Sequence, residues 1–201
     1  MTSKKLLRNF YTQPTLKVAK DLLGKLIVRK TGKKKIVGII VETEAYIGPE
    51  DKASHAYGGK ITRRNRAEYL IGGHIYIYLV YGMYWQLNIS TSDEGEPECI
   101  LLRALEPIDT DKKSSKFNVL SSKVAVMPNG PGKLCQYLKV DKSFYGEDVT
   151  KSKRIWLLDN NRKFKKSEIA VVPRIGIDYA AEWAKKPWRF YIKGNPFVSK
   201  K

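Results

Sequence analysis

The sequence predicts an α+β fold: a single mixed domain with a curved antiparallel sheet, flanking helices and a protruding β-hairpin. Many short apolar runs suit strands, whereas only two stretches have helical spacing. The length of 201 residues also suffices for one domain with a sizeable core. We therefore expect one domain over residues 1–201, with short flexible ends at about 1–8 and 197–201.

The predicted strands are short apolar runs bounded by glycine, proline and polar residues, as is usual for half-buried strands. In chain order they cover residues 26–28, 36–46, 75–90, 99–103, 155–158, 169–172 and 189–192. The first two flank a basic turn at 31–35, which predicts a hairpin. That hairpin brings Glu42 and Glu44 to a strand end.

The stretch 75–90 alternates and is rich in aromatic residues, with Gly82 near its midpoint. We expect two strands joined by a tight turn at Tyr81-Gly82-Met83, which leaves the Tyr81 ring exposed at the tip. Alternation places Tyr76 and Tyr78 on one face. Three aromatic residues of this stretch are interpreted as core residues: Tyr76, Tyr84 and Trp85.

The two predicted helices are bounded by residues typical of helix ends. Residues 16–23 stop at a glycine, and residues 133–138 follow the turn Asn129-Gly130-Pro131-Gly132. Two long segments are interpreted as loops. Residues 47–66 have the length of a functional loop, and residues 109–128 are polar and lysine-bearing, as expected of a mobile surface loop.

Charge indicates a polyanionic partner. Thirty-eight Lys and Arg against twenty Asp and Glu give a formal net charge of +18, which favours nucleic acid through electrostatic steering and counterion release. An AT-rich genome that uses lysine freely on surfaces explains the same excess, so charge alone leaves both interpretations open.

Composition also bounds the location and the metal chemistry. There is no run of roughly 18 apolar residues, and the N-terminus lacks a secretory signal. We therefore expect no membrane association and no secretion: a cytoplasmic protein if bacterial, a nuclear one if eukaryotic. Without CxxC or HxxxH spacing we expect no metal site, and Cys99 and Cys135 are interpreted as reduced core residues.

Two carboxylates two residues apart in a strand, Glu42 and Glu44, share one face. They could be an acid–base pair, part of a metal site or salt-bridge residues, and spacing alone favours salt bridges. The same alternation places Tyr46 on the face of Glu44, a pairing suited to a flat base.

The predicted hairpin and the loop before it offer further candidates. An exposed aromatic ring such as Tyr81 can wedge into a base stack, as in proteins that kink DNA from the minor groove and extrude a nucleotide. A single histidine in a loop, such as His55, is more often a solvated or capping residue than a catalyst. The arginines of this loop suit phosphate contacts, although most surface arginines have no such role; they are Arg63, Arg64 and Arg66.

These motifs, in this order and over nearly the whole chain, resemble the alkyladenine (3-methyladenine) DNA glycosylase family. The matching segments are 42–51, 53–55, 58–59, 62, 64–66, 76–78, 81–84, 88–90, 101–107, 130–136, 174–177, 182–184 and 187–191. The chain departs from the pattern at Trp85, Gln86 and the 109–128 loop, which puts the substrate range in doubt and leaves the chemistry intact.

The resemblance implies a catalytic role for two side chains. Glu44 is similar to the general base that deprotonates the attacking water. Arg103 is similar to the arginine that positions this water, with the main-chain carbonyl of Ile175 as a further ligand. A carboxylate within hydrogen-bond reach is the base that a weak nucleophile such as water needs.

The resemblance also implies a base pocket and DNA contacts. Tyr46, His55 and Tyr78 are similar to the walls that sandwich a flipped base, and Asn88 to the side chain that disfavours guanine. Tyr81 is similar to the residue that fills the gap in the duplex, at the tip of a hairpin that enters the minor groove. Further expected DNA contacts are Met83, Thr62, Arg63, Arg64, Arg66 and Lys133.

The implied activity is monofunctional excision of alkylated or deaminated purines from damaged double-stranded DNA by a monomer. No lysine beside Glu44 suggests a Schiff base, so we expect an abasic site without strand cleavage and no cofactor. The acid that would assist a neutral purine is not identified. Two alternatives stay open: a module that binds distorted nucleic acid without chemistry, and a metal-dependent nuclease using Glu42, Glu44 and Asp51.

Overall fold

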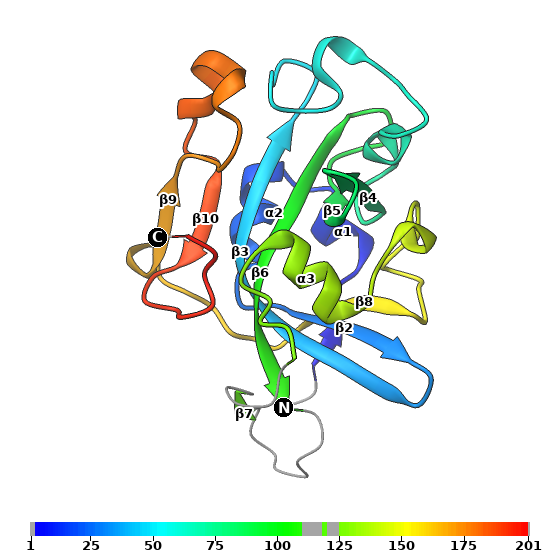
Figure 1. Cartoon of the computed structure of the whole chain (residues 1–201), viewed down its shortest axis with the longest axis vertical. Coiled ribbons are helices and arrows are strands. Elements are labelled where there is room, and N and C mark those ends of the chain that lie inside the picture. Colours follow the sequence, from blue (N-terminus) through cyan, green and yellow to red (C-terminus); the bar gives the residue numbers. More distant parts are fainter. Residues whose placement is uncertain (1–2, 110–117, 120–124, 201) are drawn as a thin grey trace.

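The structure, a computed structural model, describes residues 3–109, 118–119 and 125–200 (Figure 1). The strands within this part are β1 (Lys4–Lys5), β2 (Leu26–Thr31), β3 (Lys34–Ile47), β4 (Ile75–Val80), β5 (Tyr84–Ser90), β6 (Glu98–Asp109), β7 (Asn118–Val119), β8 (Ile155–Asp159), β9 (Ile169–Val172) and β10 (Arg189–Ile192). The α-helices are α1 (Arg8–Tyr11), α2 (Thr15–Asp21) and α3 (Pro131–Leu138). Short 3-10 helices are η1 (Tyr57–Gly59), η2 (Arg66–Tyr69), η3 (Lys142–Phe144), η4 (Lys166–Glu168) and η5 (Asp178–Lys185).

These strands form one antiparallel sheet. Its main path runs β1-β8-β2-β3-β6-β5-β4, while β10 pairs with β3 and β9, and β7 pairs with β6. The path ends at β1 on one side and at β4 on the other, so the sheet is open. The large antiparallel sheet and the few helices confirm the predicted α+β class.

The long strand β3 organises the sheet because three strands pair with it. β2 pairs with residues 34–39, β10 pairs with residues 42–44, and β6 runs along the opposite edge. The register with β6 shifts on either side of Glu42, which marks a β-bulge or irregularity there. The segment that carries Glu42 and Glu44 is therefore enclosed between two strands.

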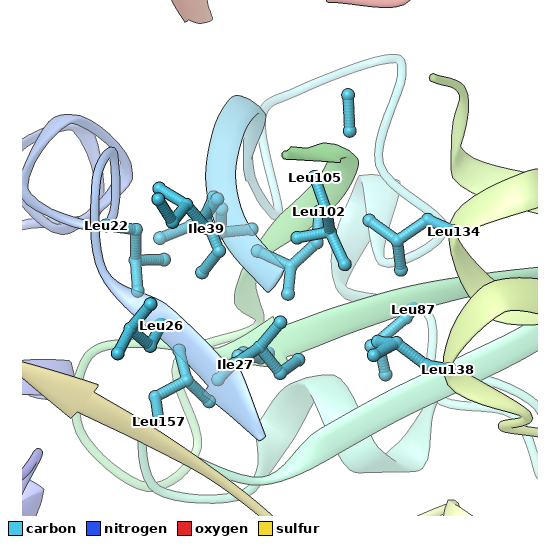
Figure 2. Packing of buried hydrophobic residues seen from close by; sticks show 14 of the residues in the cluster. Leu22, Leu26, Ile27, Ile39, Leu87, Leu102, Leu105, Leu134, Leu138 and Leu157 are labelled. Carbon is cyan, nitrogen blue, oxygen red and sulfur yellow. The ribbon is translucent and has the colours of Figure 1, made fainter. Parts of the chain in front are cut away.

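Helices and sheet share one main hydrophobic core. Leu134 and Leu138 of α3 lie against the strand residues Leu87 and Leu102 (Figure 2). The predicted helix is present, but it begins two residues earlier, because Gly130 is its N-cap and Pro131 occupies its first turn. Both cysteines are buried and free, as expected.

Strand alternation around the glutamates also agrees with the prediction. The Thr43 hydroxyl donates a hydrogen bond of 2.9 Å to the Ala19 carbonyl of α2, so Thr43 faces that helix. Glu42 and Glu44 contact a shared arginine, Arg103, from the other face of the strand. The predicted hairpin of β2 and β3 and the predicted hairpin of β4 and β5 are both present.

Some structural features differ from those that the sequence predicts. Tyr84, interpreted as a core residue, is exposed because it lies one residue after the β4–β5 turn. Both predicted flexible ends make contacts with the rest of the protein: residues 4–5 pair with β8, and the Ser199 side chain bonds Glu42. The flexibility of these ends stays a prediction.

Of the predicted 109–128 loop, residues 110–117 and 120–124 lie outside the described residues. No helix in the described ranges is long and apolar enough to cross a membrane.

Candidate active site

The turn between β4 and β5 presents Tyr81 to solvent. Tyr81 and Gly82 both have positive φ, +52° and +69°, and the Met83 N–H donates to the Val80 carbonyl at 3.1 Å. Val80 pairs with Tyr84, so the connection has three residues, and its first two have the positive φ values of a type I′ turn. A bulky side chain at positive φ is strained. The Tyr81 side chain is 85% exposed, so the strain is not offset by burial of its ring.

Glu42 lies at the centre of a buried ion network. Its Oε1 accepts hydrogen bonds from Arg103 Nε at 2.9 Å and from Arg189 Nη1 at 2.8 Å. The N–H of Ser199 donates to Oε2 at 2.7 Å. Glu42 is fully buried, and these charged donors mark it as a structural ion-pair residue.

Glu44, also fully buried, accepts three hydrogen bonds. Tyr46 Oη at 2.9 Å and Arg103 Nη1 at 3.1 Å donate to its Oε2, and the Ile175 N–H donates to its Oε1 at 2.8 Å. A carboxylate has about four lone-pair sites, so one site on Oε1 is left for a further donor such as water. Ile175 acts here through its N–H; the role expected for its carbonyl stays a prediction.

The groups around Glu44 keep their protons. Burial would lower the pKa of Arg103, but the neighbouring Glu44 and Glu42 outweigh it and raise that pKa. Burial first, and then the charge of Glu44, raise the pKa of the Tyr46 hydroxyl well above its usual value. Arg103 therefore stays a cation and Tyr46 a neutral donor, so both hydrogen bonds to Glu44 persist at neutral pH.

A cleft with a volume of about 480 Å³ lies next to the donors of Glu44, although Glu44 itself is not among its lining residues. All three donors to Glu44, namely Tyr46, Arg103 and Ile175, contribute to its lining. Besides these it is lined by Ala53, His55, Arg64, Tyr78, Leu79, Val80, Tyr81, Gln86, Leu101, Gly176, Ile177 and Tyr179. The cleft thus brings the candidate catalytic residues, the candidate wall residues and Tyr81 together.

The aromatic walls of the cleft are fixed by contacts to one another. The His55 ring meets the Tyr78 ring edge-on, with 4.6 Å between centroids, and its Nδ1 lies 2.5 Å from Tyr76 Oη. Burial first, and then the nearby Arg64, lower the pKa of His55 to about 4. The imidazole is therefore neutral at pH 7, so it would not repel a positively charged base placed between these rings.

The loop that carries His55 is attached to the segment after β9 by a second buried ion pair. Arg174 Nη1 and Nη2 donate to Asp51 at 2.5 and 2.9 Å, and both side chains are fully buried. The Arg174 guanidinium also lies over the Tyr46 ring, 4.7 Å from its centroid. This pair therefore fixes the loop and one wall of the cleft at the same time.

The nuclease alternative required carboxylates that are free to bind a metal. In the structure Glu42, Glu44 and Asp51 each pair with an arginine instead. No group of three or more potential ligands from His, Cys, Asp and Glu occurs among the described residues. The arginine pairing disfavours that alternative.

Asn88 lies behind the cleft. Its Nδ2 donates to the carbonyls of Tyr76 and Gln86 at 3.1 and 3.3 Å, so its amide orientation is fixed. It lines a separate, much smaller cavity of about 10 Å³ next to the His55 and Tyr78 rings.

The expected DNA contacts lie at and around the rim. Arg64 lines the cleft, and its guanidinium lies 5.0 Å from the Tyr78 ring centroid. Met83 is 63% exposed beside Tyr81. Thr62 bonds Asn65 within the loop, and Lys133 bonds Asn129 at the start of α3. Two further arginines are exposed without lining the cleft: Arg63 and Arg66.

Sequence reasoning assigned no role to several residues of this site. Tyr179 lines the cleft and is 72% exposed, a position that only the fold of η5 reveals. A buried arginine looks like a surface arginine in sequence, because its partners are remote along the chain. The other unassigned residues are Glu68, Arg174, Arg189 and Ser199.

Comparisons with known proteins converge on one family. A family model described as Methylpurine-DNA glycosylase matches residues 9–196. A Clostridium novyi protein named "Putative 3-methyladenine DNA glycosylase" is 46% identical over 205 residues, covering 98% of this chain and 100% of the relative. The human "DNA-3-methyladenine glycosylase" is 39% identical over 201 residues, covering 94% of this chain and 66% of the human protein.

Proposed function

This chain belongs to the methylpurine-DNA glycosylase family, which makes it a DNA glycosylase, and from that premise we propose that it excises damaged purines after flipping them into the cleft. The proposed substrates are 3-methyladenine, 7-methylguanine, hypoxanthine and ethenoadenine in duplex DNA. The product is an abasic site, and the enzyme acts as a monomer in base-excision repair.

One observation carries the proposal: Glu44 lies behind a cleft whose lining includes all three of its hydrogen-bond donors. Tyr46 joins the two functions, because it forms a cleft wall and donates to Glu44. A water held at the unused site of Glu44 Oε1 would lie at the edge of a base bound against Tyr46. Glu44 then takes a proton from this water as its oxygen attacks the sugar carbon C1′.

The charge of the cleft walls supports a preference for cationic bases. An alkylated purine carries a positive charge that its departure removes, and aromatic faces attract such a cation. Tyr46, Tyr78 and His55 are all neutral at pH 7, since burial raises the pKa of both tyrosines and lowers that of the histidine.

The strained tip of the β4–β5 hairpin supports the flipping step. Strained backbone often marks functional sites, and an exposed ring such as Tyr81 has the shape of a minor-groove wedge. Tyr81 lines the cleft as well, so it would occupy the duplex next to the nucleotide that the cleft receives. The net charge of +18 supplies attraction to the phosphates.

The direct test is single-turnover base release from duplexes that each contain one of the four lesions. We expect Glu44→Gln to reduce release by about 10²–10⁴-fold, because general-base catalysis is lost. Glu94→Gln, at an exposed residue away from the cleft lining, is the matched control and should act like the unmodified protein. Equal release by the two variants would remove Glu44 from its role.

The flipping role of Tyr81 has its own test. Tyr81→Ala should weaken binding to a lesion-containing duplex about tenfold, because stacking of an aromatic ring on bases contributes about 1–3 kcal/mol. Weak binding to undamaged duplex, which depends on phosphate contacts and salt, should change little. Unchanged lesion affinity would contradict the wedge.

A further inference from the structure

A second glutamate lies next to the aromatic wall of the cleft, where it lines a small cavity together with Tyr46 and Tyr78. Glu68, in η2, is 2% exposed, and its Oε2 has no hydrogen-bond partner in the structure. Its Oε1 accepts one weak hydrogen bond, from Cys99 Sγ at 3.4 Å. A buried carboxylate with so few donors is costly, so Glu68 holds its proton instead.

The surroundings of Glu68 favour the neutral acid. Burial first, and then the negative charge of Asp51, raise the pKa of Glu68 to about 8, although the hydrogen bond from Cys99 opposes the shift. Oε1 accepts that hydrogen bond, so the proton belongs on Oε2, the oxygen that lacks a partner. At neutral pH Glu68 is therefore a buried acid with a proton to donate.

Glu68 lines the small cavity of about 10 Å³. This volume is close to the space that one water needs. Cys99, Tyr76 and Asn88 also line it and supply polar atoms that such a water requires. Four residues line both this cavity and the cleft: Tyr46, Ala53, His55 and Tyr78. The small cavity therefore adjoins the cleft along the residues that we propose hold the base.

No other group lining the small cavity can supply a proton at pH 7. The pKa of His55 is lowered to about 4 by burial and by Arg64, so its ring is already neutral. Burial raises the pKa values of Tyr76 and Cys99. The titratable groups that interact with Glu68 are Tyr69 on its own helix η2 and, on other segments, Asp51, Tyr76, Tyr78, Cys99 and Tyr145. His55 also lines the small cavity, and the cations that act on these tyrosines are Arg64 and Arg66.

We propose that Glu68 is the proton source for the excision of neutral purines, passing its proton from Oε2 through one water in the small cavity to the base in the cleft. This inference rests on the proposed function and names the acid for one class of its substrates. Glu68 does not touch the base and acts only through the water, so it is a positioning residue and not a catalytic one.

The step balances in protons and electrons. As the bond between C1′ and the purine nitrogen breaks, its electron pair stays on the base, and the base takes the proton that Glu68 supplies through the water. Glu44 takes one proton from the attacking water, whose oxygen forms the new bond to C1′. Glu68 ends as a carboxylate and Glu44 as an acid, and proton exchange with solvent resets both. A cationic base needs no proton from Glu68, because it leaves neutral.

The test compares ethenoadenine, a neutral lesion, with 3-methyladenine, a cationic one, each in duplex DNA. Single-turnover release is measured between pH 5.5 and 9.5 for the unmodified protein, Glu68→Gln and Cys99→Ala. In the unmodified protein, the ratio of ethenoadenine to 3-methyladenine release should fall above pH 8, about tenfold per unit. Glu68→Gln should lower ethenoadenine release about 10²–10⁴-fold with a ratio independent of pH, because an amide cannot transfer the proton.

Cys99→Ala provides a second, independent variant. It removes the donor that stabilises ionised Glu68, so the fall in the ratio should move to higher pH. Release of 3-methyladenine reports whether each variant is folded. If Glu68→Gln releases both lesions as the unmodified protein does, the inference is wrong while the proposed function stands. If the unmodified protein releases neither lesion, the proposed function itself fails.

Discussion

Two buried glutamates lie next to residues that line the cleft, and they differ in their hydrogen-bond partners. Glu44 receives hydrogen bonds from an arginine, a tyrosine and a main-chain N–H. Glu68 is nearly as buried but receives a single thiol hydrogen bond. The donors of Glu44 stabilise a carboxylate, whereas the desolvation of Glu68 stabilises the neutral acid.

Because of this difference, the same residue type can serve as a base at one position of the site and as an acid at another. A base must accept a proton and an acid must supply one, and the three donors of Glu44 and the single thiol donor of Glu68 suit these two different roles. Substitutions of the residues around one glutamate, with the other glutamate as reference, test this difference.

The largest expected effect is on the side of Glu44. Arg103→Met removes donors to both Glu42 and Glu44 and leaves buried charge uncompensated, so unfolding free energy should fall by about 3–5 kcal/mol. Urea unfolding at pH 7 measures it. Arg64→Met, at an exposed arginine of the cleft rim, is the matched control and should stay within about 0.5 kcal/mol. Equal losses would mean that the ion network is not structural.

The second prediction concerns the pH dependence of stability. The pKa of Glu68 rises from 4.5 to about 8 on folding, so between these values the folded state holds a proton that the unfolded state has released. Stability therefore falls as pH rises through this window, by up to about 1.4 kcal/mol per unit. Glu68→Gln lacks this term and should gain about 2–4 kcal/mol relative to the unmodified protein between pH 5 and 8.

Urea unfolding at pH 5, 6.5 and 8 checks this dependence. Glu94→Gln, at an exposed glutamate, should follow the unmodified protein at all three values. Parallel curves for Glu68→Gln and the unmodified protein would show that Glu68 is ionised in the folded state, and the contrast with Glu44 would disappear.

Two tyrosine-to-phenylalanine variants sharpen the contrast further. Tyr46→Phe removes a hydrogen bond to the charged Glu44 and should cost about 1.5–3 kcal/mol. Tyr76→Phe removes one to the neutral His55 and should cost about 0.5–1.5 kcal/mol. Thermal or urea unfolding of the pair at pH 7 gives the difference. A larger loss of unfolding free energy for Tyr76→Phe would contradict the expectation that the hydrogen bond to Glu44 is the stronger of the two.

The smallest effect is expected outside both walls, at the hairpin tip. Tyr81→Asn should stabilise the protein by about 0.5–1 kcal/mol, because asparagine tolerates the left-handed conformation observed there. Met83→Asn, two residues on, gives no such relief, since positive φ occurs in this turn only at Tyr81 and Gly82. Neither variant should alter the pH dependence of stability. A gain that varies with pH would link the tip to the buried glutamates.

Local pattern was enough for the elements that depend on neighbouring residues. The β4–β5 turn was predictable because Gly82 interrupts an alternating aromatic run, and its exposed tyrosine followed from that turn. Helix α3 was predictable from Gly130 and Pro131. The shared face of Glu42 and Glu44 followed from the two-residue period of a strand.

The sequence by itself determined the fold class, the hairpins and, through resemblance, the family and the candidate roles of Glu44 and Tyr46. Which carboxylates have arginine partners, and which one has only a thiol donor, became known only from the tertiary structure. Glu42 and Arg189 are far apart in the chain, as are Asp51 and Arg174, and they meet only because β10 pairs with β3 and the following loop folds back. The charge state of a buried glutamate depends on such distant donors, so the contrast between the surroundings of Glu44 and Glu68 became visible only in the folded protein.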